Sequence, residues 1–190
     1  MVPEEIRTQR LVLRRFHRRD AEALAEAVLA SIDDLTLWLP WASPDYRRED
    51  AVQFIRDSMQ AWREAKAHDF GIGLTGDPRH VGNASIWHVS RANAVGEIGY
   101  WIRSDKTSRG VATEATERLL RLGFEEMGMH RITLRIAVGN RASERVAEKL
   151  GFTMEGVLRQ ELRVAGRWLD HTIYSMLEHE FHRQWGRATA

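Results

Sequence analysis

The stretch Thr107-Ser108-Arg109-Gly110-Val111-Ala112-Thr113-Glu114-Ala115 is the most informative part of this chain. It joins an expected strand, residues 95–102, to an amphipathic helix, and Gly110 stands at the junction. The free N–H groups and the dipole of a helix N-terminus attract anions, and glycine lets a phosphate approach the backbone closely. The stretch therefore predicts an anion site to which Arg109 adds donors, although a tight turn before an ordinary helix has the same pattern. The stretch 107–115 matches neither GxxxxGK[ST] nor GxGxxG, so ATP and NAD are not the expected ligands.

A second segment follows the expected strand 131–136. Asn140 is placed to cap a helix over residues 141–150, with Ser143 at its third position. Gly151 fits the left-handed residue that ends such a helix, and Phe152 returns the chain to the core. Capping alone would explain this segment.

The rest of the chain predicts one mixed α+β domain over residues 1–190. A strand at 11–16 precedes two helices, one beginning after Asp20 as its N-cap and one over 49–65, with Pro40 interrupting the aromatic stretch between them. Three strands at 69–75, 81–89 and 95–102 form an antiparallel meander with turns at 76–78 and 91–93. Helical periodicity then runs from Ala112 to about Gly128, and strands at 152–162 and 169–178 end the order β-α-α-β-β-β-α-β-α-β-β. This order disfavours a doubly wound parallel sheet.

Composition excludes several classes of protein. The 190 residues include 28 Lys+Arg, 27 Asp+Glu and no cysteine. A cysteine nucleophile, a disulfide and a cysteine metal site are therefore impossible, and no metal is expected. A formal charge of +1 does not indicate a nucleic-acid binder, and the arginines at 14–15 and 18–19 support that interpretation only weakly. No signal peptide or apolar run of about 20 residues is visible, so a cytoplasmic protein without a membrane partner is expected.

Taken together, the two segments and the strand between them resemble the GNAT acetyltransferase superfamily. The resemblance extends to its RimJ/RimL-like branch, which includes ribosomal-protein N-terminal acetyltransferases, and covers residues 8–180. It is carried by Thr8–Arg14, Glu97–Ile102, Gly110–Ala115, His130–Ile132, Asn140–Phe152, Glu155-Gly156, Asp170 and Tyr174-Ser175. It implies a single GNAT-like domain whose mostly antiparallel, twisted sheet splays at the coenzyme site and is flanked by helices.

The resemblance also implies that the chain binds acetyl-CoA as a co-substrate. Thr107 stands where the superfamily commonly has Gln or Arg, and Ala147 stands where many members have the tyrosine that serves as general acid. Ser143 then becomes the expected proton donor to the departing coenzyme sulfur. The residues implied to bind the coenzyme are Trp101, Ile102, Arg103, Thr107, Ser108, Arg109, Gly110, Val111, Ala112, Thr113, Asn140 and Ser143.

The implied reaction is direct attack of a primary amine on the acetyl thioester while both substrates are bound. The lack of cysteine agrees with this route. A main-chain N–H within residues 101–103 would stabilise the oxyanion. Glu97 is the expected base, because it shares a strand face with Trp101 and burial would raise its pKa; Glu161 and His88 are the rivals.

Tryptophans are expected to wall the acceptor site. In the branch that this chain resembles, Trp38 and Trp41 border the acceptor pocket, and Trp87 and Trp101 are expected on its floor. Packing in the core is the alternative for each tryptophan, and His88 is a further expected acceptor residue. The acceptor itself, a protein N-terminus or a small amine, stays open, as does the oligomeric state, for which a homodimer is a candidate. Two alternatives remain: a non-catalytic acyl-CoA-binding module, and an acyltransferase that uses a longer donor such as succinyl-CoA.

Overall fold

A single eight-stranded sheet organises the computed structural model, which describes residues 2–186. Its strand order is β1-β2-β3-β4-β5-β6-β8-β7, and every neighbouring pair is antiparallel except β5 and β6. The strands are β1 (Glu5–Arg7), β2 (Leu11–Arg15), β3 (Ala67–Leu74), β4 (Asp77–Ser90), β5 (Val95–Ile102), β6 (Arg131–Ala137), β7 (Thr153–Val164) and β8 (Arg167–Leu177).

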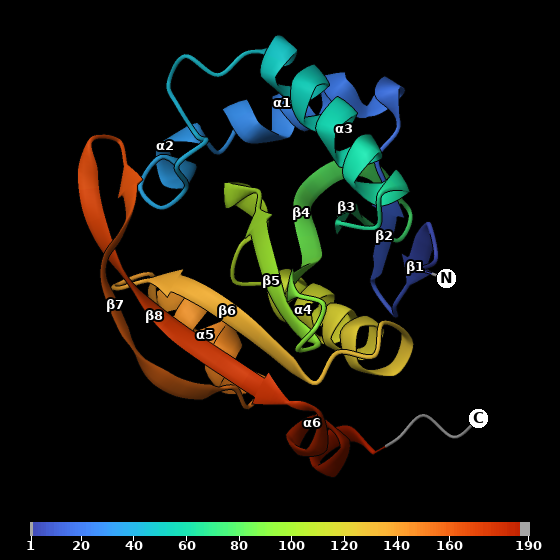
Figure 1. Ribbon diagram of the computed structural model, residues 1–190. Helices are drawn as coiled ribbons and strands as arrows, with labels where there is room; N and C mark the ends of the chain where they lie inside the picture. The colour runs from blue at the N-terminus through green and yellow to red at the C-terminus, as the bar shows by residue number, and fades with distance from the viewer. Residues whose placement is uncertain (1, 187–190) are drawn as a thin grey trace.

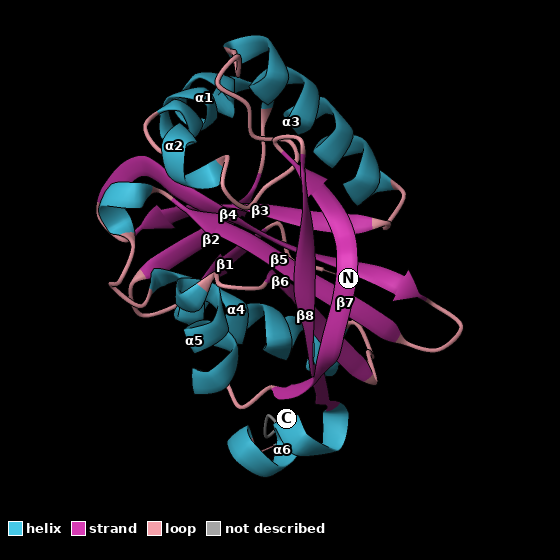
Figure 2. Ribbon diagram, turned by 90° about the vertical axis from the view of Figure 1, so that its left-hand side faces the viewer, coloured by secondary structure: helices cyan, strands magenta, loops and turns pink. Residues whose placement is uncertain are grey.

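Helices cover both faces of the sheet, so the chain forms two cores. One face carries α1 (Ala21–Leu29), α2 (Ile32–Leu35) and α3 (Arg48–Arg63), and the other carries α4 (Val111–Arg121) and α5 (Arg141–Lys149) (Figure 2). Phe16, Val28 and Ile55 belong to the first core, whereas Leu119, Leu134 and Val146 belong to the second. α6 (Glu178–Trp185) closes the lower end of the second core through the fully buried Phe181.

The sheet opens between β5 and β6. These strands pair only at Val95↔Arg131, Gly96↔Ile132 and Glu97↔Thr133, and beyond Glu97 they diverge (Figure 1). The expected mostly antiparallel, splayed sheet of a mixed α+β domain is therefore confirmed. The last five residues of β5, 98–102, are left without a neighbour on the β6 side.

Local signals placed most elements correctly. Asn140 caps α5, because its Oδ1 accepts a hydrogen bond from Ser143 N–H at 3.2 Å, and Gly151 ends that helix with φ +76°. The helix α4 continues through a π-helical turn at 122–126 before Gly128.

Some expectations about elements were wrong. Asp20 does stand at the N-cap position of α1, but its side chain makes no capping hydrogen bond: the carboxylate accepts from His17 N–H at 2.7 Å and pairs with Arg14. The turn at 76–78 is shorter than expected, because β4 already begins at Asp77. β1, α2 and α6 were not predicted, because they are short and mostly polar. None of the described helices has the length and apolar character that crossing a membrane requires.

Candidate active site

A cavity of about 570 Å³ lies where β5, the start of α4 and the start of α5 meet. Leu35 and Leu39 border it from the α2 side. Most of the residues expected to bind a coenzyme line this first cavity: Trp101, Ile102, Thr107, Ser108, Gly110, Val111, Ala112, Thr113, Asn140 and Ser143.

The N-terminus of α4 offers unpaired backbone donors to this cavity. Gly110 is left-handed with φ +78°, and Ser108 is also left-handed with φ +59°. The first hydrogen bond of the helix runs from Glu114 N–H to the Gly110 carbonyl at 3.0 Å. The N–H groups of Val111, Ala112 and Thr113 are therefore not used by the helix, which is the arrangement that binds phosphate oxygens.

Positive side chains reinforce this anion site. Three cationic residues line the cavity: Lys106, Arg145 and Lys149. Among the described lining residues, Asp34 is the only acidic one. A diphosphate with an extended apolar arm fits such a cavity, because its lining combines cations and free amides with the apolar surface of Trp38 and Leu39.

Two arginines expected at the coenzyme do not line the cavity. Arg103 is held by Glu26 and Asp105, with N–O distances of 2.7 and 2.9 Å, and Arg109 offers its carbonyl to Arg10 Nη1 at 2.9 Å. The Thr107 hydroxyl is also engaged, because it donates to the Ser104 carbonyl at 2.9 Å.

Glu114 fixes the loop before α4 to the first hairpin of the sheet. Its carboxylate accepts hydrogen bonds from Thr8 Oγ1, from Arg10 N–H at 3.1 Å and from Arg10 Nε at 2.7 Å. Partial burial acts to raise the pKa of Glu114, but these hydrogen bonds outweigh it and hold that pKa below its ordinary value. The turn between β1 and β2 thus positions the anion site.

Ser143 and Tyr100 both line the first cavity, and their side chains are in contact. Burial raises the pKa of Tyr100 to about 12, and a contact with the Ser143 hydroxyl offsets part of this effect. Tyr100 Oη is buried and has no hydrogen bond of normal geometry to the described residues. At neutral pH it is therefore a protonated phenol free to donate.

Backbone donors of β5 also face this region. Arg103 N–H donates to the Val81 carbonyl of β4 at 2.9 Å. Since N–H directions alternate along an antiparallel strand, the N–H groups of Tyr100 and Ile102 are directed away from β4, toward the side from which β6 has diverged. Within the expected range 101–103, Ile102 is therefore the residue whose amide faces the opening.

A second cavity, of about 640 Å³, lies on the other side of β5 below α1 and α3. Leu39, Tyr100 and Trp101 line both cavities, so the two meet at the end of β5. Trp41 and Trp87 line the second cavity, whereas Trp38 lines the first. The Trp41 ring lies 6.2 Å from that of Trp101 and 6.1 Å from that of Tyr46, centroid to centroid.

Glu97 and the rival bases lie outside both sets of lining residues. The Glu97 carboxylate is buried and pairs with Arg135 Nε at 2.9 Å, and Arg135 also contacts Glu161 at 2.7 Å. Burial raises the pKa of Glu97 despite the opposing effect of Arg135. His88 follows Trp87 on β4 without reaching either cavity.

Sequence reasoning missed several lining residues. Tyr100 stood inside the quoted strand Glu97–Ile102, and its alternation with Trp101 could have placed it on the α5 side. Lys106 ends the short 3-10 turn Ser104–Lys106 that follows β5. Arg145 and Lys149 repeat along α5 at a spacing of four, which could have indicated one helix face. Asn83, Ser85 and Tyr46 carried no local signal, because only tertiary packing brings them together.

The splayed sheet, the anion-binding start of α4 and the capped α5 define an acyltransferase of the GNAT type. The chain belongs to this family: the family model described as "Acetyltransferase (GNAT) domain" matches residues 10–153.

Individual relatives lie in the same branch that the sequence resembles. The chain is 34% identical over 175 residues to "Putative ribosomal N-acetyltransferase YdaF" of Bacillus subtilis (strain 168), covering 91% of this chain and 94% of that protein. It is 26% identical over 171 residues to "[Ribosomal protein uS5]-alanine N-acetyltransferase" of Escherichia coli (strain K12), covering 89% and 88%. The solved structure of the microcin C7 self-immunity acetyltransferase MccE, in complex with acetyl-CoA and AMP, superposes with a TM-score of 0.86 at 26% identity, covering 92% and 97%.

Proposed function

We propose that this protein transfers an acetyl group from acetyl-CoA to a primary amine by direct attack while both substrates are bound. The observation that carries the proposal is the meeting of two cavities at the splayed end of β5, where Leu39, Tyr100 and Trp101 line both. One cavity has the donors for a diphosphate, and the other has the aromatic walls for an acceptor.

The coenzyme would lie in the first cavity. Acetyl-CoA supplies an activated acetyl thioester, and its diphosphate would be held by the amides at Gly110–Thr113 and by Lys106. MccE, which is similar in fold, was solved with acetyl-CoA bound, and this supports the assignment. Arg103 and Arg109 would contribute to the loop structure rather than contact the diphosphate directly.

The protein's groups around the β5 end would assist the transfer. The Ile102 N–H is placed to donate to the developing oxyanion. Ser143, with Tyr100 beside it, would donate a hydrogen bond to the departing sulfur, and the proton lost by the amine balances the thiol that leaves. Two hydroxyls would thus take the role of the tyrosine that many family members have at the position of Ala147.

For the base, we propose Glu97 acting through water. Its cross-strand neighbour is Trp87, which lines the acceptor cavity, and burial raises its pKa toward the range useful for base catalysis. Arg135 lowers that pKa and holds the carboxylate, so a water relay fits the geometry better than direct contact.

The acceptor would be a protein N-terminus or a small amine. The names of the relatives support the first class, because one of them acts on a ribosomal-protein alanine. A longer acyl donor such as succinyl-CoA is the alternative for the other substrate, and the cations of the first cavity would suit its carboxylate. A cytoplasmic location without a membrane or nucleic-acid partner, a homodimer and the absence of a metal remain predictions.

The test is a thiol-release assay. Purified protein with acetyl-CoA is expected to release free coenzyme A thiol with at least one member of a panel of N-terminal peptides and small amines. Background thiol release across the whole panel, together with a raised melting temperature in acetyl-CoA, would instead identify a non-catalytic acyl-CoA-binding module. Faster release from succinyl-CoA than from acetyl-CoA would assign the longer donor.

A further inference from the structure

The second cavity, called here the acceptor cavity, has an uneven distribution of charge. Among the described residues that line it, the charged ones are Asp45 and Asp50, and both are carboxylates. The first cavity carries an excess of cations by contrast. A cationic acceptor is therefore the one that this cavity attracts.

An independent observation lies at the inner part of the same cavity. Ser85 Oγ lies 2.6 Å from Asp69 Oδ1, and Asn83 Nδ2 lies 3.2 Å from Ser85 Oγ. An ionised carboxylate can only accept a hydrogen bond, so the Ser85 hydroxyl donates its single proton to Asp69. Ser85 Oγ must then accept a hydrogen bond from the Asn83 NH₂ group. This relay fixes the orientation of the Asn83 side chain.

The Asn83 carbonyl is left without a donor. Asn83 is 7% exposed, lines the acceptor cavity, and its Oδ1 has no hydrogen-bond partner among the described residues. A buried acceptor that stays unpaired is destabilising, whereas a bound N–H group would satisfy it. The acceptor cavity is therefore suited to a ligand that carries an N–H donor as well as a positive charge.

Aromatic rings connect the reaction point with the acidic end of the cavity. From Trp101, at the junction of the two cavities, the rings continue to Trp41 at 6.2 Å and on to Tyr46 at 6.1 Å. Burial, with a smaller contribution from the charge of Asp50, raises the pKa of Tyr46 to about 12, which places Asp50 at this outer end. Asp50 therefore lies beside Tyr46, and two aromatic contacts separate Tyr46 from Trp101 along this series of rings.

The position of the carboxylates determines which positive group of the acceptor they can stabilise. A carboxylate close to the attacked amine would favour its ammonium form, which cannot attack. A carboxylate at the outer end stabilises a different cation of the same acceptor, and the rings between them can contact its chain or its charge.

We propose that the acceptor is a dicationic amine: one amine reacts at the β5 end, an adjacent N–H donates to Asn83 Oδ1, and a second positive group lies between Tyr46 and the carboxylates of Asp45 and Asp50. A peptide N-terminus followed by Arg or Lys and a polyamine both have this chemistry. The inference rests on the proposed acetyl transfer, and it adds what the acceptor must carry.

The experiment compares matched acceptors by kcat/KM in the thiol-release assay. The pairs are 1,5-diaminopentane against pentylamine, and Ser-Arg-Ala against Ser-Gln-Ala peptides. The dicationic member is expected to react about three- to tenfold faster, with the advantage shrinking as salt is added. A preference within one pair only would show whether the source is a peptide or a small amine.

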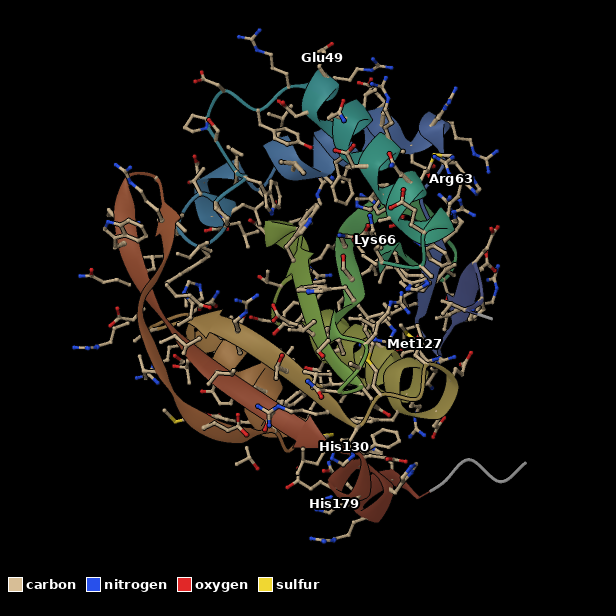
Figure 3. The ribbon with its side chains drawn as sticks, in the orientation of Figure 1. Glu49, Arg63, Lys66, Met127, His130 and His179 are labelled. Atoms are coloured by element: carbon tan, nitrogen blue, oxygen red, sulfur yellow. The ribbon has the colours of Figure 1, made fainter. Side chains whose placement is uncertain are left out.

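Substitutions at the two carboxylates and at Asn83 test whether these side chains recognise the acceptor. Asp45→Asn combined with Asp50→Asn should remove the preference, and the amide at 50 can still accept from Arg47 N–H, which the carboxylate does at 2.7 Å. Glu49→Gln is the matched control, because Glu49 lies on α3 and points outward, away from the cavity (Figure 3). Asn83→Leu should raise KM for both peptides, whose second residue supplies the N–H next to the reacting amine, without changing acetyl-CoA affinity.

Two outcomes separate the inference from the function beneath it. Equal kcat/KM for both members of each pair, or an unchanged preference in the double variant, would overturn the dicationic acceptor and leave acetyl transfer intact. Background thiol release with every amine would overturn the proposed function itself.

Discussion

Gly110 has a backbone conformation and surroundings that other residues tolerate poorly. Its φ is +78°, and an added Cβ would meet Arg10 Nη2 at 3.2 Å. We expect Gly110→Glu to weaken acetyl-CoA binding by about a hundredfold or more, because a negative side chain would stand at the N-terminus of α4 where the diphosphate is proposed to lie. Isothermal titration with acetyl-CoA measures the change.

Gly76→Glu provides a matched control for that variant. Gly76 has φ +81° and no atom within 4 Å of its added Cβ, and it lies between β3 and β4, outside the cavities. Both variants place the same negative side chain at a similar positive φ, so equal acetyl-CoA affinities for the two would show that the loop before α4 is only a turn.

The hydroxyls of Ser143 and Tyr100 are expected to matter for turnover rather than for coenzyme binding. Ser143→Ala and Tyr100→Phe should each lower kcat about ten- to a hundredfold, because each removes a donor near the departing sulfur, while acetyl-CoA affinity stays unchanged. The double variant should lose less than the product of the single losses, because the two groups act together.

Tyr174→Phe is the control for that pair, because Tyr174 is a buried tyrosine of β8 outside both cavities. A normal kcat in both Ser143→Ala and Tyr100→Phe would remove the two hydroxyls from the mechanism.

The start of α4 is held in place by hydrogen bonds to the turn between β1 and β2. Thr8 and Arg10, in the turn between β1 and β2, bind the Glu114 carboxylate in the first turn of α4. The sequence shows Glu114 near a helix start, where the dipole favours acids, but the partners are about a hundred residues away along the chain. Only the folded sheet brings them together.

Glu114→Gln should cost about 1–2 kcal/mol of unfolding free energy at pH 7. The pKa of Glu114 is lowered in the folded state, so its stabilising contribution is present above the ordinary glutamate pKa and is lost as the pH falls through the folded value. The difference between the parent and the variant should therefore shrink below about pH 4.3. Urea unfolding at pH 7 and pH 3 measures it; a difference that is the same at both pH values would contradict the ionic role.

Across the whole molecule, the splay of β5 and β6 leaves a cleft between two cores. The first core lies under α1 and α3, and the second lies under α4 and α5, so a ligand in the first cavity contacts α2, β5, α4 and α5 together. A ligand that binds only the folded state raises its stability by mass action.

Acetyl-CoA at a hundred times its Kd should therefore raise Tm by roughly 5–11 °C, from about 2.7 kcal/mol of added stability in a chain of this size. Differential scanning fluorimetry measures the shift. The Gly110→Glu variant should show almost none at the same concentration, and an equal shift in that variant would place the coenzyme elsewhere.

The sequence by itself determined the architecture, because local signals carry it. Alternating apolar residues, the Asn140 cap and the glycines at 110 and 151 specify where strands and helices begin and end, since these signals act within a few residues. Together with the family resemblance, the same signals pointed to most of the residues that line the first cavity, because a helix start suited to phosphate is contiguous in sequence. Family resemblance supplied the expected chemistry.

Only the tertiary structure decided which side chains meet. Arg103 and Arg109 were predicted to bind the coenzyme. In the structure Arg103 pairs with two carboxylates, and neither arginine lines the first cavity. Tyr100 reaches Ser143, and Asn83 reaches the acceptor cavity, through packing between elements distant in sequence. The physical reason is that helix caps and turns depend on local backbone geometry, whereas cavity lining and ion pairing depend on long-range packing.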